Sequence, residues 1–350
     1  MGPGGTRHAL ASTDLSDRHS SGRPLRLIRR FGPYLLALGV IGALLLFASP
    51  ERFAQATRRF NPTVAPLLAL LSFCYYLLQG VRWRPLLAAA GVKIPFPRAI
   101  LLNFAGQAVG LLPGGELARC VLVSEVCQSE VGDAVATVTV QELIYSLLIT
   151  AVAVPGSLRW PEAAAGVLLS LVGIATVFLV LTVPAVFRAV TRVLGRIPVA
   201  RRYTGDVEEL RRSTVLLLTR WDTLAWSLVS VAQVLITVTM FWLAVQAVAP
   251  GMLSYPQAAL VYAIAHLAGS LSFSPGGLGG FEAVCVGMLL AFGVPLSAAI
   301  AASLVQRLSD KGLGTLYGTA AYLVARRRYQ LQRRSMVHHR STRRKAPTPT

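Results

Sequence analysis

Charged residues are scarce in this chain. Asp, Glu, Lys and Arg make up 14% of its 350 residues, whereas a soluble domain carries about a quarter. Residues 61–81, 163–187 and 223–281 contain no charged side chain. Such apolar runs predict transmembrane helices, because a helix satisfies its own backbone hydrogen bonds in lipid. We therefore predict an all-α polytopic membrane protein and exclude a soluble domain.

The chain also lacks common signatures of metal and transferase chemistry. None of its four cysteines forms a Cys-x-x-Cys pair, and all lie in or beside apolar segments: Cys74, Cys120, Cys127 and Cys285. We interpret them as small apolar residues rather than disulfides or metal ligands. The loops hold no Asp-x-Asp, and no histidine lies in a loop outside the tails. No metal or cofactor is expected.

The charge that is present is strongly basic, with a net value of +19, and it is unevenly placed. Residues 1–30 carry +4, residues 188–220 carry +5 and residues 326–345 carry +9. All three regions flank apolar runs, as the positive-inside rule describes. They indicate anionic membrane lipids as partners and exclude nucleic acid. We predict a multi-pass protein of the cytoplasmic membrane with both termini cytoplasmic.

The predicted organisation is a transmembrane domain, 31–325, between disordered basic tails, 1–30 and 326–350. Arg82-Trp83-Arg84 after the second span is interpreted as an interfacial aromatic with flanking charges. Six spans are expected, near 33–48, 61–81, 131–154, 163–187, 223–248 and 296–325. Two kinds of protein partner are consistent with the sequence: further copies of this chain in a homo-oligomer, or a separate lipid-modifying enzyme.

Two Pro-Gly-Gly breaks indicate an internal repeat, with repeat one at 97–187, repeat two at 256–325 and the basic loop 188–220 between them. Matched positions lie 159, 162 and 165 residues apart, at Pro97/Pro256, Pro113/Pro275 and Gln141/Gln306. The breaks comprise Pro113, Gly114 and Gly115 in the first repeat, and Pro275, Gly276, Gly277, Gly279 and Gly280 in the second.

The breaks predict two re-entrant helical hairpins, 99–128 and 256–294. The first enters from the cytoplasm and the second from outside, because three spans separate them. The repeats are then inverted, an arrangement typical of transporters. The alternative is eight or nine plain spans, which would put both breaks at bilayer surfaces.

Ionisable side chains near the bilayer centre mark candidate sites, because they are costly there unless paired or wetted. Helix starts after the breaks favour anions, arginine grips phosphate in bidentate fashion, and carboxylates balance arginines, carry protons or pair with a cationic headgroup. The candidates for substrate binding are Glu116, Arg119, Glu142, Glu282, Arg307, Asp310 and Lys311. The alternative is that these charges only lock the hairpins to neighbouring helices. His266 is a weaker candidate, interpreted as a hydrogen-bonded histidine.

At these residues the chain resembles the flippase-like transmembrane domain of lysylphosphatidylglycerol synthases and its stand-alone relatives. The similar motifs are Asn103 with 112–119, and 274–282 with 293–295 and Arg307. The resemblance covers roughly residues 30–325. It implies movement of a lipid with an anionic or aminoacylated headgroup between leaflets, with Glu116, Arg119, Glu282 and Arg307 at the site.

One position departs from the family pattern. Relatives tend to have Arg after the equivalent of Glu142 and an Asp a little further on, whereas Leu143, Tyr145 and Ser146 stand here. The sequence therefore does not determine whether the substrate, or the energy coupling of its transport, is the same as in the relatives. The chain shows no soluble aminoacyl-transfer domain, so we do not expect it to be a complete synthase.

Three functions compete. The leading one is translocation or binding of a phospholipid or a polyprenyl-phosphate-linked lipid. The second is a membrane enzyme acting on such a headgroup, disfavoured by the absence of a metal-binding acidic cluster. The third is a non-transporting membrane partner protein. Loss of Arg119 or Arg307 would abolish lipid movement under the first function and turnover under the second. Under the third it would affect little beyond stability.

The hairpin prediction is testable with single cysteines at positions 113 and 275. Because re-entrant breaks lie at mid-membrane, both are expected to react with a membrane-impermeant thiol reagent more slowly than cysteines in the loops. Reaction at the loop rate would instead place the breaks at the bilayer surface.

Overall fold

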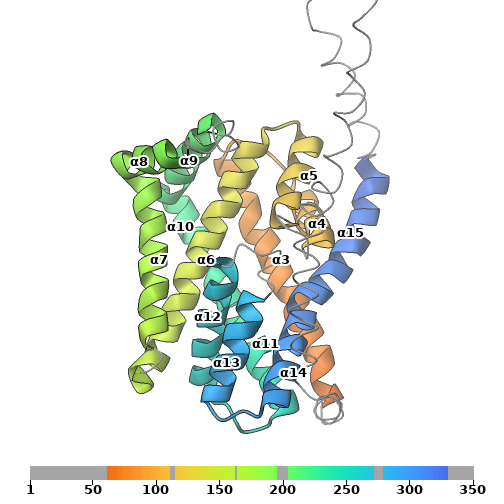
Figure 1. The fold of residues 1–350 in the computed structure, drawn as a ribbon. Helices are drawn as coiled ribbons and strands as arrows, with labels where there is room; N and C mark the ends of the chain where they lie inside the picture. The colour runs from red at the N-terminus through yellow and green to blue at the C-terminus, as the bar shows by residue number, and fades with distance from the viewer. Residues whose placement is uncertain (1–60, 111–114, 162–163, 195–203, 272–278, 330–350) are drawn as a thin grey trace, which may run out of the picture.

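The computed structural model of this chain describes residues 61–110, 115–161, 164–194, 204–271 and 279–329 (Figure 1). The predicted first span, 33–48, and both basic tails lie outside the described residues. Throughout the described part the regular structure is helical.

Thirteen α-helices make up most of this part. They are α3 (Ala65–Ala89), α4 (Phe96–Gly106), α5 (Ala118–Cys127), α6 (Val131–Arg159), α7 (Ala164–Thr182), α8 (Pro184–Leu194), α9 (Thr204–Thr219), α10 (Trp221–Ser227), α11 (Val229–Val248), α12 (Tyr255–Leu271), α13 (Gly280–Ala291), α14 (Leu296–Arg307) and α15 (Leu313–Tyr329). Short 3₁₀ turns stand at Pro62–Val64, Gln107–Val109 and Gly115–Leu117, and a π-helical turn, Leu308–Gly312, joins α14 to α15.

Four of the described helical segments are long and apolar enough to cross a membrane: Pro62–Ala89, Val131–Arg159, Ala164–Thr182 and Trp221–Val248. They match four of the predicted spans, and the prediction of an all-α membrane protein is confirmed. The residues of the predicted span 296–325 form a continuous helical run of α14, the π-helical turn and α15, which is not among these four segments. It is less apolar than the other four because Arg307, Asp310 and Lys311 lie within it.

Two pairs of shorter helices begin and end at opposite ends of the bundle (Figure 1). α4 starts and α5 ends at the upper end in the figure, beside the end of α3 and the start of α6. α12 starts and α13 ends at the lower end, between α11 and α14. With 11 and 10 residues, α4 and α5 are about 17 and 15 Å long. A hydrocarbon core of about 30 Å is too thick for either to cross alone.

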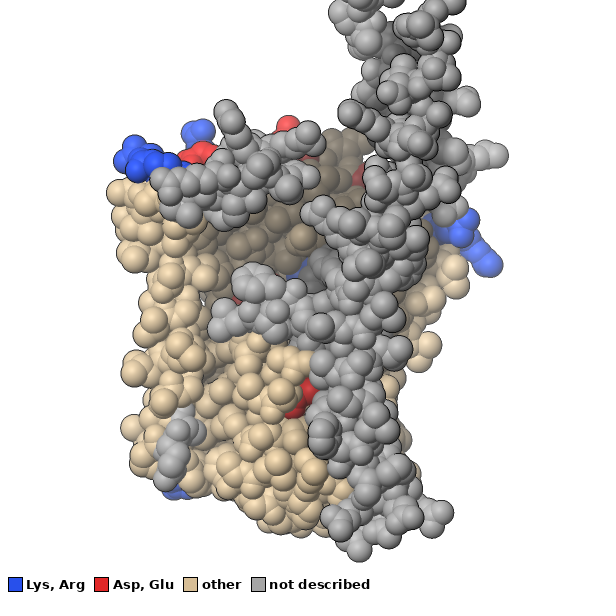
Figure 2. Space-filling view, in the orientation of Figure 1, with Lys and Arg blue, Asp and Glu red and all other residues tan. Residues whose placement is uncertain are grey.

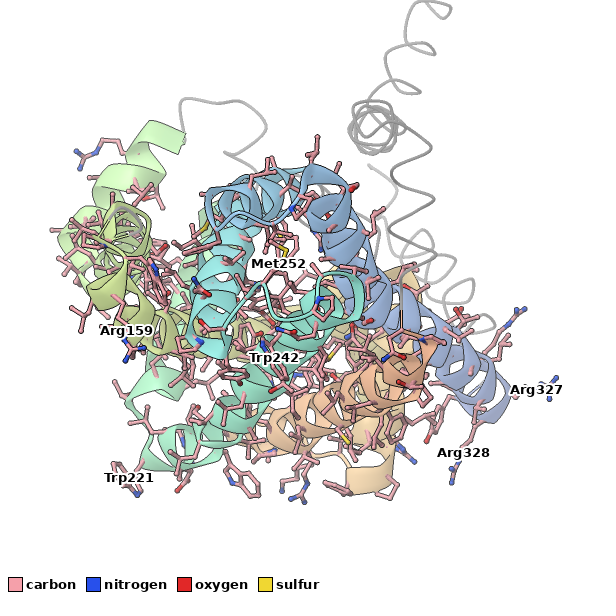
Figure 3. The ribbon with its side chains drawn as sticks, turned by 90° about the horizontal axis from the view of Figure 1, so that it is seen from below. Arg159, Trp221, Trp242, Met252, Arg327 and Arg328 are labelled. Atoms are coloured by element: carbon pink, nitrogen blue, oxygen red, sulfur yellow. The ribbon has the colours of Figure 1, made fainter. Side chains whose placement is uncertain are left out.

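Basic side chains gather at the upper end. Figure 2 shows Lys and Arg along this end, over α8 and α9 and at the tip of α15. Seen from below, Arg327 and Arg328 point outward at the rim of the bundle, and the lower loop around Met252 is apolar (Figure 3). Among the described residues of the lower end, Arg159 is the charged one.

The core is divided into two main clusters that follow the two helix pairs. One is centred on α11, α12, α13 and α14 with the lower half of α6. The other joins α3, α4 and α5 to the start of α6 and the end of α15. Each helix pair therefore has its own packed core, and α6 contributes to both.

The side chain of Trp83, interpreted from the sequence as an interfacial aromatic, does not face the outside of the bundle. Trp83 is fully buried in the upper cluster, and its indole N–H donates to Thr137 Oγ1 at 2.8 Å. Arg82 is buried as well, and Arg84 is exposed. α3 continues to Ala89, so this segment is the last part of a helix covered by α4 and α6 rather than the edge of a span.

Two glycines allow α15 to approach α3 and α4 closely. A Cβ at Gly314 would lie 2.3 Å from the hydroxyl oxygen of Tyr76, and one at Gly318 would lie 2.3 Å from the backbone nitrogen of Ala108. The two glycines are four residues apart and therefore lie on one helix face, the small-xxx-small arrangement of close membrane helices.

We expect Gly318→Ala to lower the free energy of unfolding by about 1–3 kcal/mol, because the added methyl group meets backbone atoms that cannot rotate away. Thermal unfolding in detergent micelles measures the change. Gly173→Ala in α7 is the matched control, since no described atom lies within 4 Å of its Cβ position. Equal stability of the two variants would contradict the close approach.

Candidate functional site

A cavity of about 220 Å³ lies among α3, α6, α12, α13 and α14. Its charged lining residues are Glu142, Arg307, Asp310 and Lys311. Glu142 comes eleven residues after the start of α6 at the upper end, and Arg307 eleven residues after the start of α14 at the lower end. Each is therefore about 16 Å along its helix, so the cavity lies near mid-depth in the bundle.

An ion pair fixes the α12–α13 pair to α14. Nε of Arg307 donates to Oε1 of Glu282 at 2.5 Å, and the Arg307 guanidinium lies over the ring of Phe281, 4.7 Å from its centroid. Oε2 of Glu282 accepts a hydrogen bond from the backbone N–H of Gly279 at 2.7 Å. Glu282 therefore caps the N-terminus of α13 and neutralises Arg307, and only 3% of its surface is exposed.

A second ion pair joins α5 to α6. Nη2 of Arg119 lies 3.7 Å from Oε1 of Glu142, and the Arg119 guanidinium lies 5.2 Å from the ring centroid of Trp83. Arg119 is fully buried, whereas 47% of the Glu142 side chain is exposed. A charge-assisted hydrogen bond would be about 2.7–2.9 Å long. This pair is looser than the one at Arg307.

The two ion pairs have opposite polarity along the chain. Glu142 and Arg307 are 165 residues apart, the same separation as Gln141 and Gln306. α5 carries Arg119 and the following helix, α6, carries the acid. α13 carries Glu282 and the following helix, α14, carries the base. Each pair ties a short helix to the long helix after it.

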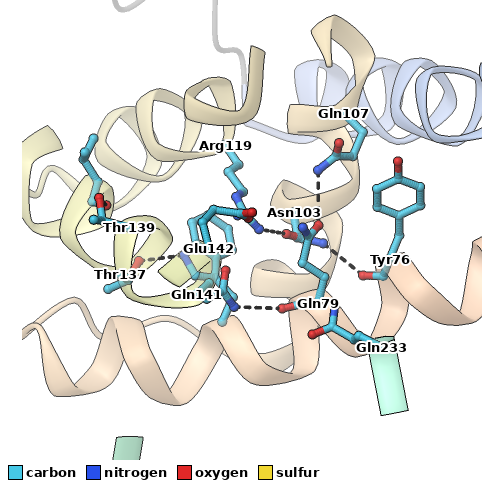
Figure 4. Close-up of polar contacts among 12 residues, drawn as sticks. Tyr76, Gln79, Asn103, Gln107, Arg119, Thr137, Thr139, Gln141, Glu142 and Gln233 are labelled. Carbon is cyan, nitrogen blue, oxygen red and sulfur yellow. Dashed lines mark hydrogen bonds and ion pairs between the residues drawn. The ribbon is translucent and has the colours of Figure 1, made fainter. Parts of the chain in front are cut away.

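A polar chain connects the first ion pair to the π-helical turn, and Figure 4 shows its part from Arg119 through Asn103 to Tyr76. Arg119 Nη1 donates to Asn103 Oδ1 at 2.9 Å, and Asn103 Nδ2 donates to the carbonyl of Tyr76 at 3.0 Å. The Tyr76 hydroxyl donates to the carbonyl and Oδ1 of Asp310, at 3.1 and 3.2 Å. α5 and the π-helical turn are thus linked through α4 and α3.

The remaining wall is aromatic and amide-rich. Tyr75, Tyr145 and Tyr262 line it, and His266 stacks on Tyr262 with ring centroids 6.0 Å apart. Gln306 also lines the cavity, and no described group makes a hydrogen bond to its buried amide atoms. This arrangement can accept a small polar group, because it offers both charge signs, hydroxyls and an amide.

The π-helical turn Leu308–Gly312 places two charges on the cavity wall. Asp310 and Lys311 both belong to it, directly after Arg307. π-helical turns inserted in α-helices frequently lie at functional sites. The single-face arrangement expected for Arg307, Asp310 and Lys311 agrees with their common place in the lining.

The breaks themselves are described in part. Gly115 brings its turn so close to the preceding one that a Cβ would lie 2.0 Å from the carbonyl oxygen of Val109, and Gly279 has a φ of 88°, which glycine adopts without strain. Gly280 begins α13. Pro113, Gly114, Pro275, Gly276 and Gly277 lie outside the described residues, as does the side chain of Glu116.

Sequence reasoning missed Arg82. It is 2% exposed in α3 and interacts electrostatically with both Glu142 and Arg119. Its Nε and Nη1 have no hydrogen-bond acceptor among the described residues. The only available signal is a charge within an apolar helix, and with Arg84 two residues later that signal indicates a helix end.

Four long apolar helices around a cavity with charged walls define this chain as a polytopic membrane protein. The family described as the lysylphosphatidylglycerol synthase TM region matches residues 34–318, and the chain belongs to this family. It is also 22% identical over 308 residues to a UPF0104 membrane protein of Methanocaldococcus jannaschii, an alignment that covers 81% of this chain and 91% of the relative. The family resemblance in the sequence is thereby confirmed.

Arg307→Met is expected to lower the free energy of unfolding by about 3–5 kcal/mol, because it leaves Glu282 buried and unpaired. The double variant Glu282→Gln/Arg307→Met should recover much of this loss, since it leaves no uncompensated charge. Denaturation in detergent micelles measures both.

Arg220→Met is the control for this prediction, because it removes one partner of the exposed Arg220–Asp222 pair and should cost less than about 1 kcal/mol. If the double variant recovers none of the stability that Arg307→Met loses, the ion pair contributes nothing as a unit.

Proposed function

We propose that this protein binds the headgroup of a membrane lipid in the central cavity and moves the lipid between the leaflets of the cytoplasmic membrane. The observation that carries the proposal is the cavity near mid-depth, whose walls hold Glu142, Arg307, Asp310 and Lys311 within an otherwise apolar bundle. Charged groups at this depth are retained for substrates or ions that must pass. Membership of the lysylphosphatidylglycerol synthase TM family supports a lipid as the substrate.

The orientation follows from charge. The upper end of the bundle carries the basic loops and the basic end of α15, so the positive-inside rule makes it the cytoplasmic end. Both chain termini are then cytoplasmic, given the predicted span at 33–48.

In this orientation α4–α5 is a re-entrant hairpin from the cytoplasm and α12–α13 one from outside, the two forming an inverted repeat. The lengths of α4, α5 and α13 support this, since α13 with 12 residues is about 18 Å long and also too short to cross. Transporters with inverted repeats place the substrate at the repeat interface and open it to each side in turn. The cavity occupies that place here.

The substrate class is a lipid with an anionic or modified headgroup, either a phospholipid or a lipid linked to polyprenyl phosphate. Arginine at the wall suits a phosphate, and carboxylates with tyrosine rings suit an amine or hydroxyl on the same headgroup. Because the headgroup crosses while the acyl chains remain in lipid, a small cavity is sufficient.

The test is mass spectrometry of lipids that co-purify with the protein in native membrane discs. We expect the wild type to enrich one lipid class over the bulk membrane and Arg119→Ala/Arg307→Ala to lose that enrichment. Arg326→Ala/Arg327→Ala, at the end of α15, is the charge-matched control and should keep it. The enriched lipid, carrying a fluorescent label, should then exchange leaflets faster in vesicles that contain the wild-type protein.

The outcomes separate the competing functions. If the wild-type protein neither enriches a lipid nor accelerates its exchange between leaflets, the function that remains is that of a non-transporting membrane partner protein. Enrichment without exchange, together with chemical change of the bound lipid, would indicate a membrane enzyme.

A further inference from the structure

The two ion pairs differ in how completely the carboxylate balances the positive charge of the arginine. Arg307 has its counter-charge, because Glu282 accepts from its Nε and is itself fixed by the N-terminus of α13. Two other buried arginines, on α3 and α5, have a positive charge that the described carboxylates balance only in part.

Arg82 and Arg119 form this second group of cations. They are 2% and 0% exposed, and they repel each other electrostatically. Nε and Nη1 of Arg82 and Nε and Nη2 of Arg119 make no hydrogen bond to any described group. Buried guanidinium donors without acceptors are costly, so four such atoms on two neighbouring side chains indicate an anion with several oxygens.

Glu142 is the described carboxylate that interacts with both arginines. It lies at ion-pair distance from Arg119 but beyond hydrogen-bond length, and it also lines the cavity. One carboxylate neutralises one of two positive charges. Glu142 lies between the cavity and the arginines. An anion that enters from the cavity therefore reaches the arginines at the place that the Glu142 carboxylate occupies.

We propose that Arg82 and Arg119 together form an oxyanion-binding subsite, which receives the phosphate of the lipid headgroup when that phosphate displaces Glu142. The proposal rests on the lipid-binding function above and makes it specific. Two guanidinium groups provide paired donors for a phosphate, which a lysine could not match. The rest of the headgroup then occupies the cavity, against Asp310 and the tyrosines.

The test measures binding of dioctanoyl phosphatidylglycerol to the full-length protein in uncharged detergent. Arg82→Gln is expected to weaken binding at least about tenfold, because charged hydrogen bonds are lost. Arg84→Gln is the matched control, two residues along the same helix and exposed, and should bind as the wild type does. Inorganic phosphate as a second probe distinguishes a lipid from free phosphate as the ligand.

Glu142→Gln provides a prediction of opposite sign. It removes the competing anion, so binding of the phospholipid should become about three- to tenfold tighter. A carboxylate that only locked α5 to α6 would, when neutralised, weaken binding or leave it unchanged. Glu116→Gln is measured beside it, since Glu116 precedes Arg119 by three residues. Thermal unfolding of every variant identifies any that fail to fold.

The outcomes are distinct. If the wild type binds and Arg82→Gln binds equally well, or if Glu116→Gln alone tightens binding, the subsite is wrong while the lipid-binding function stands. If the wild type binds phosphatidylglycerol and phosphate equally, the ligand is free phosphate. If Arg82→Gln does not fold, tighter binding by Glu142→Gln supports the subsite and weaker or unchanged binding overturns it. Absence of any binding to the wild type counts against both proposals.

Discussion

Buried charge is the constraint on which the rest of this structure depends. An ionised side chain near the middle of an apolar bundle must have a partner, and here each partner is supplied by a different helix. Glu282 on α13 holds Arg307 on α14, and Arg119 on α5 holds Glu142 on α6. Because the short helices α5 and α13 carry one member of each pair, their positions in the bundle follow from the pairing as well as from apolar packing.

The irregular backbone brings these partners together. Gly279 turns the chain with a positive φ, so that its N–H reaches Glu282, and Gly115 allows two turns to meet at the first break. The π-helical turn after Arg307 adds Asp310 and Lys311 to the same wall. Such departures from regular helix are tolerated at this depth where the freed groups are buried in protein or line a cavity.

The two halves share a plan but differ in how firmly their charges are held. The pair in the second half is short and buried, with the acid also capping a helix, which suits a fixed support. The pair in the first half is long, faces the cavity through Glu142 and has Arg82 nearby. Leu143, the residue after Glu142, is partly buried and brings no charge. Arg82, a buried arginine of α3, interacts electrostatically with Glu142.

The sequence by itself determined the membrane class, four described spans, the end at which basic residues gather and the candidate charges, because hydrophobic runs and positive-inside patterns are local along the chain. Only the tertiary structure decided which acid pairs with which base, that Arg82 and Trp83 are buried, and that tyrosines from α3, α6 and α12 share one cavity. Those outcomes depend on the rotation and packing of helices far apart in sequence, for which no local pattern exists.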